Sequence, residues 1–356
     1  MPSIETDVNA RLLTRSDRPG SRFAAALAEV VVHVVSSAAE TKIEPVLVSI
    51  VIPTYQHRQK VQDALARALA QETTVEYEVI VVDDGSTDGT DREMLRLVQE
   101  TTGRLRYLRL GQNLGRATAR NAGIAAARGS IIAFTDSDCL PTPGWLEAGR
   151  HGFNDRTIGI IQGPTRPHPD QPRPFFNHFI EIERFDGTFS TCNVFYRRDA
   201  IVAVDGFDPA IEYWEDLDLG WRVQRGGWKS IFAPSALVHH QVLPLSWQRW
   251  LRWPLHFSYM PAKTASYPEY RRYLFLGLWV SWFHALFDLA LVAVLLGVLT
   301  KRYFLALVFP YLVAFPSHHG VGGRWPPAKA AFHLVWDTLS FGVLLINSLR
   351  YRSLVL

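Results

Sequence analysis

Short apolar segments alternate with helix-patterned segments between residues 46 and 138, and this alternation most constrains the fold. Strands are predicted at 46–53, 77–86, 105–110 and 130–138, and the first of these segments is a β-branched run typical of a buried strand. Between them, apolar residues recur at helical spacing in 58–71, 90–102 and 115–129. Strands and helices in this order predict right-handed crossovers, and therefore an α/β fold with a mostly parallel sheet and helices on both faces.

Polar clusters follow three of these strands at the point where each strand ends. Their sequences are PTYQ after the first strand, DDGSTDG after the second and TDSD after the fourth. In open parallel sheets, ligands bind at the carboxyl ends of the strands. The sequence therefore predicts a ligand site at this edge of the sheet.

Two pairs of aspartates lie in these clusters. Asp136 and Asp138 alternate along an extended chain, which would place both carboxylates on one side of the strand end. Carboxylates suit Mg²⁺ or Mn²⁺, which could bridge a diphosphate and neutralise a leaving group. An acidic loop without a metal is the alternative. Asp83 and Asp84 would bind a base or ribose hydroxyls, or they form a turn, since Asp, Gly and Ser favour turns.

A further acidic pair, Glu215 and Asp216, opens a helix-patterned segment. These acids either stabilise the positive end of that helix or supply a general base that deprotonates a hydroxyl. Asp218 competes for the second role but lies further into the helix. His239 and His240 end a strand-like segment, where a histidine is structural unless other metal ligands reach it.

The C-terminal part of the chain is strongly apolar. Segment 273–300 is long enough to cross a bilayer, as is 330–349, whereas 303–315 is short and contains Pro310. Both long segments are predicted to be membrane helices, with a buried helical subdomain as the alternative. Asp288 and Asp337 lie inside them and should face protein, water or a partner, because a charge in lipid is costly.

Charge, cysteine content and the N-terminal sequence exclude several classes of protein. A net charge of +3 is too small and too dispersed for nucleic-acid binding. Only Cys139 and Cys192 occur, so no disulfide framework is expected and a reducing compartment fits. Residues 1–20 lack a secretory signal pattern, and 22–40 is expected to form a short helix too short to span a bilayer.

Five motifs in this order resemble family 2 inverting glycosyltransferases, which have the Rossmann-like GT-A fold. They are VSIVIPTYQH, EVIVVDDGSTDGT, NLGRATARNAGI, FTDSD and EDLDLGWR, and the resemblance covers residues 46–245. Its implied domains are an N-terminal extension over 1–45, a GT-A domain over 46–245, an interfacial amphipathic segment over 246–272 and membrane helices over 273–356.

The resemblance also implies roles for individual residues. The residues implied to bind the nucleotide are Pro53, Thr54, Tyr55, Asp83, Asp84, Arg120 and Asp136. Asp136 and Asp138 are implied to bind the metal and the diphosphate, and one of His239 and His240 is implied to complete the metal shell. Asp216 is the implied catalytic base, with Glu215 beside it, and Cys192, Asn193 and Trp214 are implied to lie near the acceptor.

By this resemblance the chain is expected to move a sugar from a nucleoside-diphosphate sugar to a hydroxyl, with Mg²⁺ or Mn²⁺ as cofactor. The acceptor would be lipid-linked or a polysaccharide, the lipid bilayer a partner, and the catalytic domain cytoplasmic on the inner membrane. Processive members carry Q-x-x-R-W, but here Arg249 occupies the glutamine position before Arg252 and Trp253, so a non-processive enzyme is expected. The alternatives are a metal-dependent nucleotidyltransferase, although no Gly-rich, Lys-bearing phosphate loop follows the first strand, and a non-catalytic membrane scaffold.

Overall fold

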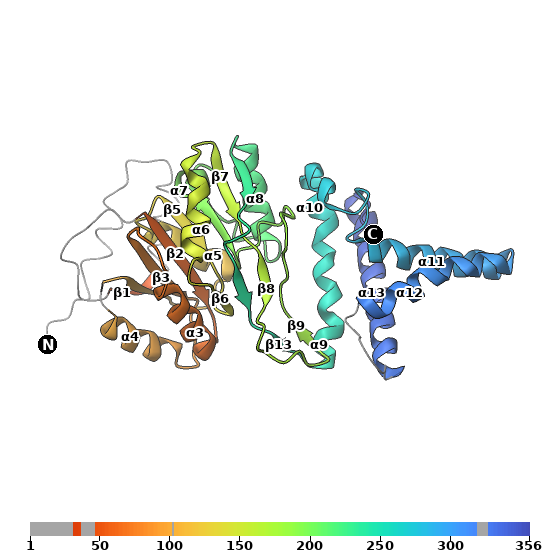
Figure 1. Ribbon diagram of the computed structural model, residues 1–356, viewed down its shortest axis with the longest axis horizontal. Helices are drawn as coiled ribbons and strands as arrows, with labels where there is room; N and C mark the ends of the chain where they lie inside the picture. Colours follow the sequence, from red (N-terminus) through yellow and green to blue (C-terminus); the bar gives the residue numbers. More distant parts are fainter. Residues whose placement is uncertain (1–30, 37–46, 102, 319–326) are drawn as a thin grey trace. The chain divides into compact units, whose positions relative to one another are not determined.

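The sequence alternation produces one large sheet in the computed structural model, which describes residues 31–36, 47–101, 103–318 and 327–356. The chain divides into two compact units, Met1–Pro244 and Leu245–Leu356. Figure 1 shows the elements of both units.

The large sheet of the first unit has the strand order β1-β4-β3-β2-β5-β10-β7-β11. Its members are β1 (Val31–Ser36), β2 (Val48–Thr54), β3 (Tyr77–Asp83), β4 (Leu105–Leu110), β5 (Ile131–Phe134), β7 (Ile158–Gln162), β10 (Val194–Arg197) and β11 (Lys229–Phe232). β2 runs parallel to β3 and β5, and β3 runs parallel to β4. β10 is antiparallel to both of its neighbours. The mostly parallel sheet predicted from the sequence is confirmed.

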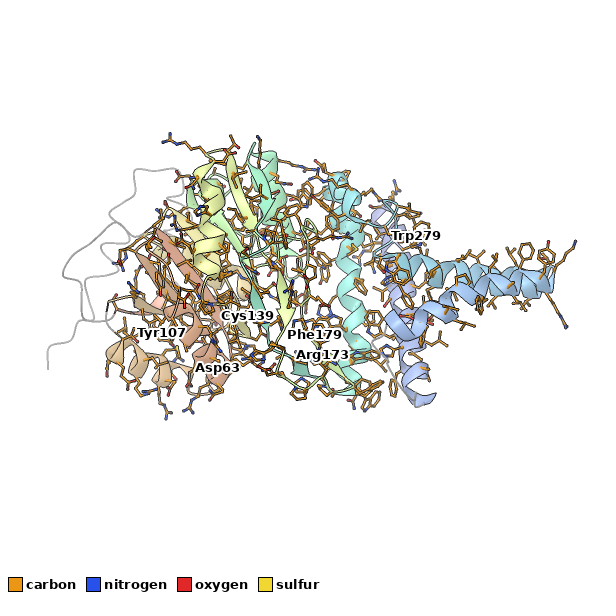
Figure 2. The ribbon with its side chains drawn as sticks, in the orientation of Figure 1. Asp63, Tyr107, Cys139, Arg173, Phe179 and Trp279 are labelled. Carbon is orange, nitrogen blue, oxygen red and sulfur yellow. The ribbon has the colours of Figure 1, made fainter. Side chains whose placement is uncertain are left out.

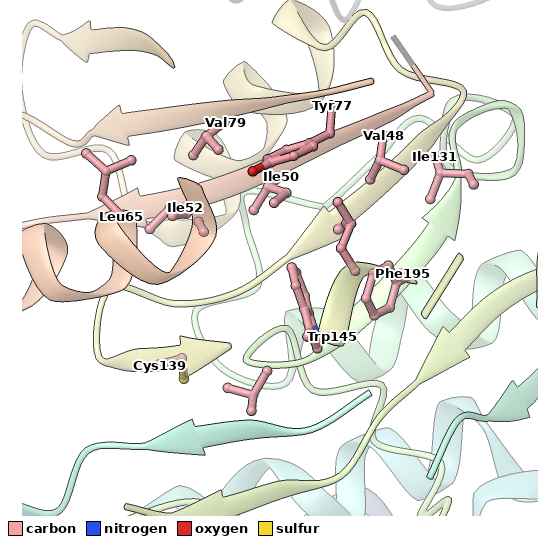
Figure 3. Packing of buried hydrophobic residues seen from close by; sticks show 14 of the residues in the cluster. Val48, Ile50, Ile52, Leu65, Tyr77, Val79, Ile131, Cys139, Trp145 and Phe195 are labelled. Carbon is pink, nitrogen blue, oxygen red and sulfur yellow. The ribbon is translucent and has the colours of Figure 1, made fainter. Parts of the chain in front are cut away.

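Helices cover both faces of this sheet, and the alternation of side chains along β2 shows it. Ile50 and Ile52 belong to the same buried cluster as Leu65 of α3 (Arg58–Leu69), as Figure 3 shows. Val51 points the opposite way, toward α5 (Arg116–Ala126), where a Cβ added at Gly123 would lie 2.4 Å from its Cγ1. The small residues of α5 therefore let this helix approach the strand closely.

Two smaller sheets complete the first unit. One has the order β6-β12-β8, with β6 (Cys139–Pro141), β12 (Val238–His240) and β8 (Thr165–Pro167). The other pairs β9 (Asn177–His178) with β13 (Leu243–Pro244). Helices α4 (Thr90–Glu100), α6 (Trp145–His151), α7 (Arg198–Val202) and α8 (Glu215–Arg225) and the 3₁₀ turn η1 (Gly152–Asn154) fill the connections.

The helix expected over 22–40 is wrong where it can be checked. Val31–Ser36 is a strand that pairs antiparallel with β4 at the sheet edge. Its sequence VVHVVS is β-branched, and the open side of β4 offers it a hydrogen-bonding partner. The rest of that segment lies outside the described residues.

A buried carboxylate joins three strands and a helix end. Glu78 accepts hydrogen bonds from the Ser49 hydroxyl at 2.7 Å and from the Arg128 backbone and Nε at 2.7 and 2.9 Å. The Arg106 guanidinium also lies 3.3 Å from it. This network ties β2, β3 and β4 to the chain that follows α5.

We expect Glu78→Gln to destabilise the protein by about 3–5 kcal/mol, because it leaves buried Arg106 without its counter-charge. Glu76→Gln is the matched control, since Glu76 and Arg104 are half-exposed and 3.8 Å apart and such pairs contribute about 1 kcal/mol or less. Thermal unfolding of the full chain in detergent measures both. Equal stability of the two variants would show that the network does not hold the strands together.

The second unit is helical. It contains α9 (Trp247–Arg252), η2 (Trp253–Tyr259), α10 (Met260–Ser266), η3 (Pro268–Tyr273), α11 (Trp282–Leu299), η4 (Arg302–Val308), α12 (Phe309–His318) and α13 (Pro327–Tyr351). Residues 282–299 and 330–351 are long and apolar enough to cross a membrane, by length and composition. The span expected from residue 273 begins only at Trp282, because Leu276 and Gly277 have positive φ and Ser281 caps the helix.

Both acids in the apolar segments have protein partners, as expected. The Trp279 indole donates to Asp288 at 2.9 Å. The Tyr311 hydroxyl donates to Asp337 at 2.7 Å. Each carboxylate is therefore hydrogen-bonded within the unit.

Candidate active site

The loops after β2, β3 and β5 meet at one edge of the large sheet and are hydrogen-bonded to one another. The Gln56 backbone N–H donates to the Ser86 hydroxyl at 2.9 Å. His57 Nδ1 lies 2.8 Å from the Ser137 hydroxyl. Neither residue was among the predicted site residues, although Ser137 lies inside the TDSD cluster and His57 directly follows PTYQ. These bonds fix the three loops against each other.

The residues expected to bind the nucleotide lie here, but several are already engaged. Asp83 accepts from the Ser86 backbone at 2.9 Å and from the Tyr107 hydroxyl at 2.7 Å (Tyr107 is labelled in Figure 2). Asp84 accepts from the backbone N–H groups of Leu114 and Gly115. Burial raises the pKa of Asp84. Both carboxylates therefore hold loops in place.

At the end of β2, two side chains are available to contact a ligand, the hydroxyl of Thr54 and the ring of Tyr55. Thr54 is buried, and its hydroxyl has no hydrogen-bond partner among the described residues. Tyr55 is 42% exposed, and Pro53 is half-buried beside them. An exposed aromatic ring and a free hydroxyl suit stacking on, and hydrogen bonding to, a planar base.

Asp136 and Asp138 do not lie on one extended strand as predicted. The Cys139 N–H donates to the Asp136 carbonyl at 3.0 Å, so the chain turns between them. Asp136 pairs with Arg120 Nη2 at 2.9 Å, whereas Asp138 Oδ1 lies 3.7 Å from His240 Nε2. The prediction that both carboxylates lie on one side of the strand end is wrong, because the chain turns here from the large sheet into β6.

Asp138, Cys139 and His240 form a candidate metal site, with one ligand atom of each within 4.8 Å of the others. His240 Nδ1 lies 2.6 Å from the Gln241 carbonyl. That carbonyl requires a proton on Nδ1, so in the neutral imidazole the Nε2 lone pair is directed at Asp138. Burial raises the pKa of the Cys139 thiol, and a protonated thiol is a poor ligand.

His239 and His240 point to opposite faces of β12, because adjacent side chains of a strand alternate. The His239 ring packs beside His168, with ring centres 5.8 Å apart, and burial lowers its pKa. Of the two predicted candidates, only His240 lies with Asp138.

Arg120 of α5 links the metal-site turn to the acids of α8. This buried guanidinium donates to Asp136 at 2.9 Å and to Glu215 at 2.8 Å. Its Nε has no partner among the described residues, and its charge lies 5.6 Å from the Phe207 ring. Arg116 lies 3.7 Å from the same Glu215 oxygen. Glu215 is therefore committed to two arginines.

Asp216 is different. It is partly buried, and its carboxylate accepts a hydrogen bond from the Leu217 backbone N–H at 2.8 Å. Burial and the adjacent Glu215 charge raise the pKa of Asp216 to about 7. A carboxylate with this pKa can accept a proton near neutral pH.

Trp214 precedes this helix with a left-handed backbone, at φ 66° and ψ 28°. A non-glycine residue in this conformation costs roughly 1–2 kcal/mol, and such strain is concentrated at functional sites. The strained residue sets the direction in which α8 begins.

Cys192 and Asn193 are two of the residues expected to lie near the acceptor. Both are fully buried. Asn193 accepts from the Trp145 indole at 2.8 Å and donates to the carbonyls of Pro164 and Ala236. All of its hydrogen-bonding groups are thus used within the protein, and it joins β10 to its neighbours.

Comparisons with known proteins agree with this architecture. Residues 49–204 match the family described as glycosyl transferase family 2, and residues 131–317 match glycosyl transferase family group 2. Glycosyltransferase AglE of Haloferax volcanii is 29% identical over 206 residues, covering 55% of this chain and 67% of AglE. Pre-mycofactocin glycosyltransferase of Mycobacterium tuberculosis is 30% identical over 179 residues, covering 46% of this chain and 37% of that protein.

A solved structure shares the fold. Mannosyltransferase PcManGT of Pyrobaculum calidifontis, in complex with GDP-Man and Mn²⁺, is 18% identical with a TM-score of 0.57. The match covers 95% of this chain and 93% of that one. The fold and the acidic sheet edge thus define a glycosyltransferase of the GT-A type. The chain belongs to glycosyltransferase family 2.

Proposed function

We propose that the protein is a metal-dependent inverting glycosyltransferase that moves a sugar from a nucleoside-diphosphate donor to a hydroxyl of a membrane-associated or polysaccharide acceptor. The observation that carries this proposal is Asp216, an acid of raised pKa at the start of α8. Arg120 connects its neighbour Glu215 to the turn that holds Asp136 and Asp138. A proton acceptor and a candidate diphosphate site are therefore joined through one guanidinium.

The donor nucleotide would lie across the ends of β2 and β3. Tyr55 and Thr54 offer a ring and a hydroxyl to the base, with Pro53 beside them. Asp83 and Asp84 shape the adjoining loops through their hydrogen bonds. Arg120 holds Asp136 and Glu215 in place at this edge, and its Nε is the one guanidinium nitrogen left for a donor oxygen among the described contacts.

The residues at the β5–β6 turn fit a divalent cation. Asp138 supplies a carboxylate oxygen, and the fixed tautomer of His240 supplies a nitrogen lone pair. Mg²⁺ and Mn²⁺ both accept carboxylate ligands, and the imidazole favours Mn²⁺ over Mg²⁺. Bound there, such a cation would offset negative charge on the departing diphosphate.

Asp216 would act as the general base. Its carboxylate takes the proton from the acceptor hydroxyl while the hydroxyl oxygen bonds to the anomeric carbon. The bond from that carbon to the diphosphate oxygen breaks, and the nucleoside diphosphate leaves with the electron pair. One displacement inverts the anomeric centre. Glu215 keeps the pKa of Asp216 high through its negative charge.

We further propose that the second unit attaches the enzyme to the inner membrane, with the catalytic unit in the cytoplasm. Its apolar helices support this attachment. An acceptor held in or at the bilayer then follows from the location of the enzyme. Arg249 at the position of the processive glutamine favours a single transfer over polymer synthesis.

The direct test incubates purified protein with a panel of nucleotide sugars and Mn²⁺. Release of free nucleoside diphosphate supports sugar transfer or donor hydrolysis. Pyrophosphate release would instead indicate the nucleotidyltransferase alternative, which the family matches disfavour. Absence of any nucleoside-diphosphate binding with Mn²⁺ would favour the non-catalytic scaffold.

The raised pKa of Asp216 predicts a pH profile. The deprotonated carboxylate is the active form, so kcat/KM should fall about tenfold per pH unit as pH drops below about 7. Glu215→Gln removes the adjacent negative charge, lowers the pKa of Asp216 and should move this acid limb to lower pH. Initial rates across pH measure the limb, and an unshifted limb in Glu215→Gln would contradict the assignment.

A further inference from the structure

We propose that the second unit enters the bilayer only through a hairpin formed by α11 and η4–α12, while α9–η2–α10 and α13 lie along the membrane surface. This inference rests on the membrane attachment proposed above and adds its topology. It departs from the prediction that 330–349 is a second span.

The hairpin has the length of a bilayer crossing in both directions. α11 has 18 residues, or about 27 Å of helix. The return through η4 and α12, with 7 and 10 residues, covers about 29 Å at 3₁₀ and α-helical rises. These lengths match the hydrocarbon core of roughly 30 Å.

Contacts along the hairpin show that its two arms run antiparallel. Near the tip, a Cβ added at Gly297 would lie 2.6 Å from Leu305 Cδ2. Near the base, the ring centres of Phe283 and Phe287 lie 5.3 and 5.4 Å from that of Tyr311. The arms therefore pack on each other from base to tip.

The outer surface of the hairpin is apolar and its tip is basic. Exposed apolar side chains of the two arms include Leu289, Leu291, Val292, Val294, Leu295, Val298, Leu299, Leu305, Leu307, Phe309, Leu312 and Val313. Lys301 and Arg302 are exposed at the tip, and Tyr303 is 64% exposed. Basic and aromatic residues favour the headgroup layer. Two charges at the tip argue against a hairpin that stops inside the hydrocarbon.

α13 lies alongside α9–η2–α10 over most of its length. Trp250 contacts His333, with ring centres 5.1 Å apart. Further along, the Thr264 and Ser353 hydroxyls are 2.8 Å apart. Between these two contacts lie η2 and much of α10 on one side, and most of α13 on the other. α13 therefore follows the direction of the amphipathic segment.

The hairpin contacts α13 between Ala330 and Phe341, and the ring centres of Phe315 and His333 lie 6.3 Å apart. Phe287 of α11 lies 6.4 Å from Phe341, measured between ring centres, and Tyr311 of α12 donates to Asp337. Figure 1 shows α11 running away from α13 across its direction. If the hairpin follows the membrane normal, α13 lies in the membrane plane.

The outward face of α13 fits such a position. Leu334, Val335, Leu339, Ile346 and Leu349 are exposed, whereas Asp337, Ser340, Leu344 and Ser348 on the opposite face are buried. An apolar stripe facing outward suits a helix half-immersed at the interface.

The distribution of basic residues gives the hairpin an orientation. Arg249, Arg252, Arg271, Arg272, Arg350 and Arg352 lie outside the hairpin, against Lys301 and Arg302 at its tip. The excess of positive charge at the base places the base on the cytoplasmic side.

Spin-label depth measurements in vesicles of phosphatidylethanolamine and phosphatidylglycerol test the topology. Labels attached through Leu334→Cys and Leu349→Cys should report equal depths. A spanning α13 would separate them by about 22 Å, and that result would overturn the proposal. Leu289→Cys and Val298→Cys should differ by about 13 Å. The native Cys139 and Cys192 are fully buried and should stay unlabelled.

A second readout separates topology from membrane attachment. A membrane-impermeant maleimide should label Lys301→Cys from the vesicle face opposite to that which labels Arg350→Cys. Labelling of both from one face would overturn the crossing. Failure of the protein to float with the vesicles would overturn membrane attachment itself, whereas nucleotide-sugar turnover by soluble protein would leave the catalytic proposal standing.

Discussion

Asp216→Asn should bind the nucleotide sugar like the wild type and lose on the order of 10²–10⁴-fold in turnover. Asparagine has the same shape and can still accept the Leu217 N–H through its amide oxygen. It cannot take a proton from the acceptor hydroxyl. Because the side chain is not expected to touch the nucleotide, the loss should fall on kcat. Calorimetry with donor and Mn²⁺ measures binding, and single-turnover rates measure the transfer step.

Glu212→Gln is the matched control for this variant. Glu212 is an exposed acid in the connection that leads to the same helix. Its neutralisation should leave both binding and turnover unchanged. Wild-type turnover in Asp216→Asn would remove the general-base role, and equal losses in both variants would point to a general effect of charge.

His240→Ala should weaken Mn²⁺-dependent donor binding by at least about 10-fold, because loss of even an outer partner of a metal ligand costs about 10- to 100-fold. The reason is geometric, since His240 Nε2 and Asp138 Oδ1 face each other at 3.7 Å. Calorimetric titration of Mn²⁺ in the presence of nucleoside diphosphate measures the effect.

His239→Ala provides the control on the adjacent position of β12. Its side chain points to the opposite face, beside His168, so metal affinity should stay at the wild-type level. Circular dichroism checks that both variants remain folded. Equal affinity in the two variants would exclude His240 as a ligand, and a loss in both would indicate a disturbed strand.

Four of the eight described strands of the large sheet, β2 to β5, could be predicted because their signals are local. A β-branched run such as Val48–Thr54 favours a strand, and the helical spacing of Arg116–Ala126 favours a helix. β1 was missed because its partner β4 lies more than sixty residues away, and only that pairing makes Val31–Ser36 a strand. Strand pairing over long distances cannot be read from one segment.

The candidate site was predictable at the level of location but not of contacts. Strand ends placed the acids at one edge of the sheet. Which of His239 and His240 faces Asp138 depends on how β12 pairs with β6. The separation of Asp136 from Asp138 depends on one backbone hydrogen bond in the turn. The burial of Asn193 follows from three distant partners. None of these has a signature in the sequence.

The turn from β5 to β6 also has a consequence for how the enzyme matures. Asp138 arrives from the large sheet, whereas His240 is contributed by a strand of the small sheet about one hundred residues later. A newly made chain therefore has only part of the proposed cation site until the small sheet has assembled. On the proposed function, cation-assisted binding of the donor requires the completed α/β unit, and a partly folded chain should not consume nucleotide sugar.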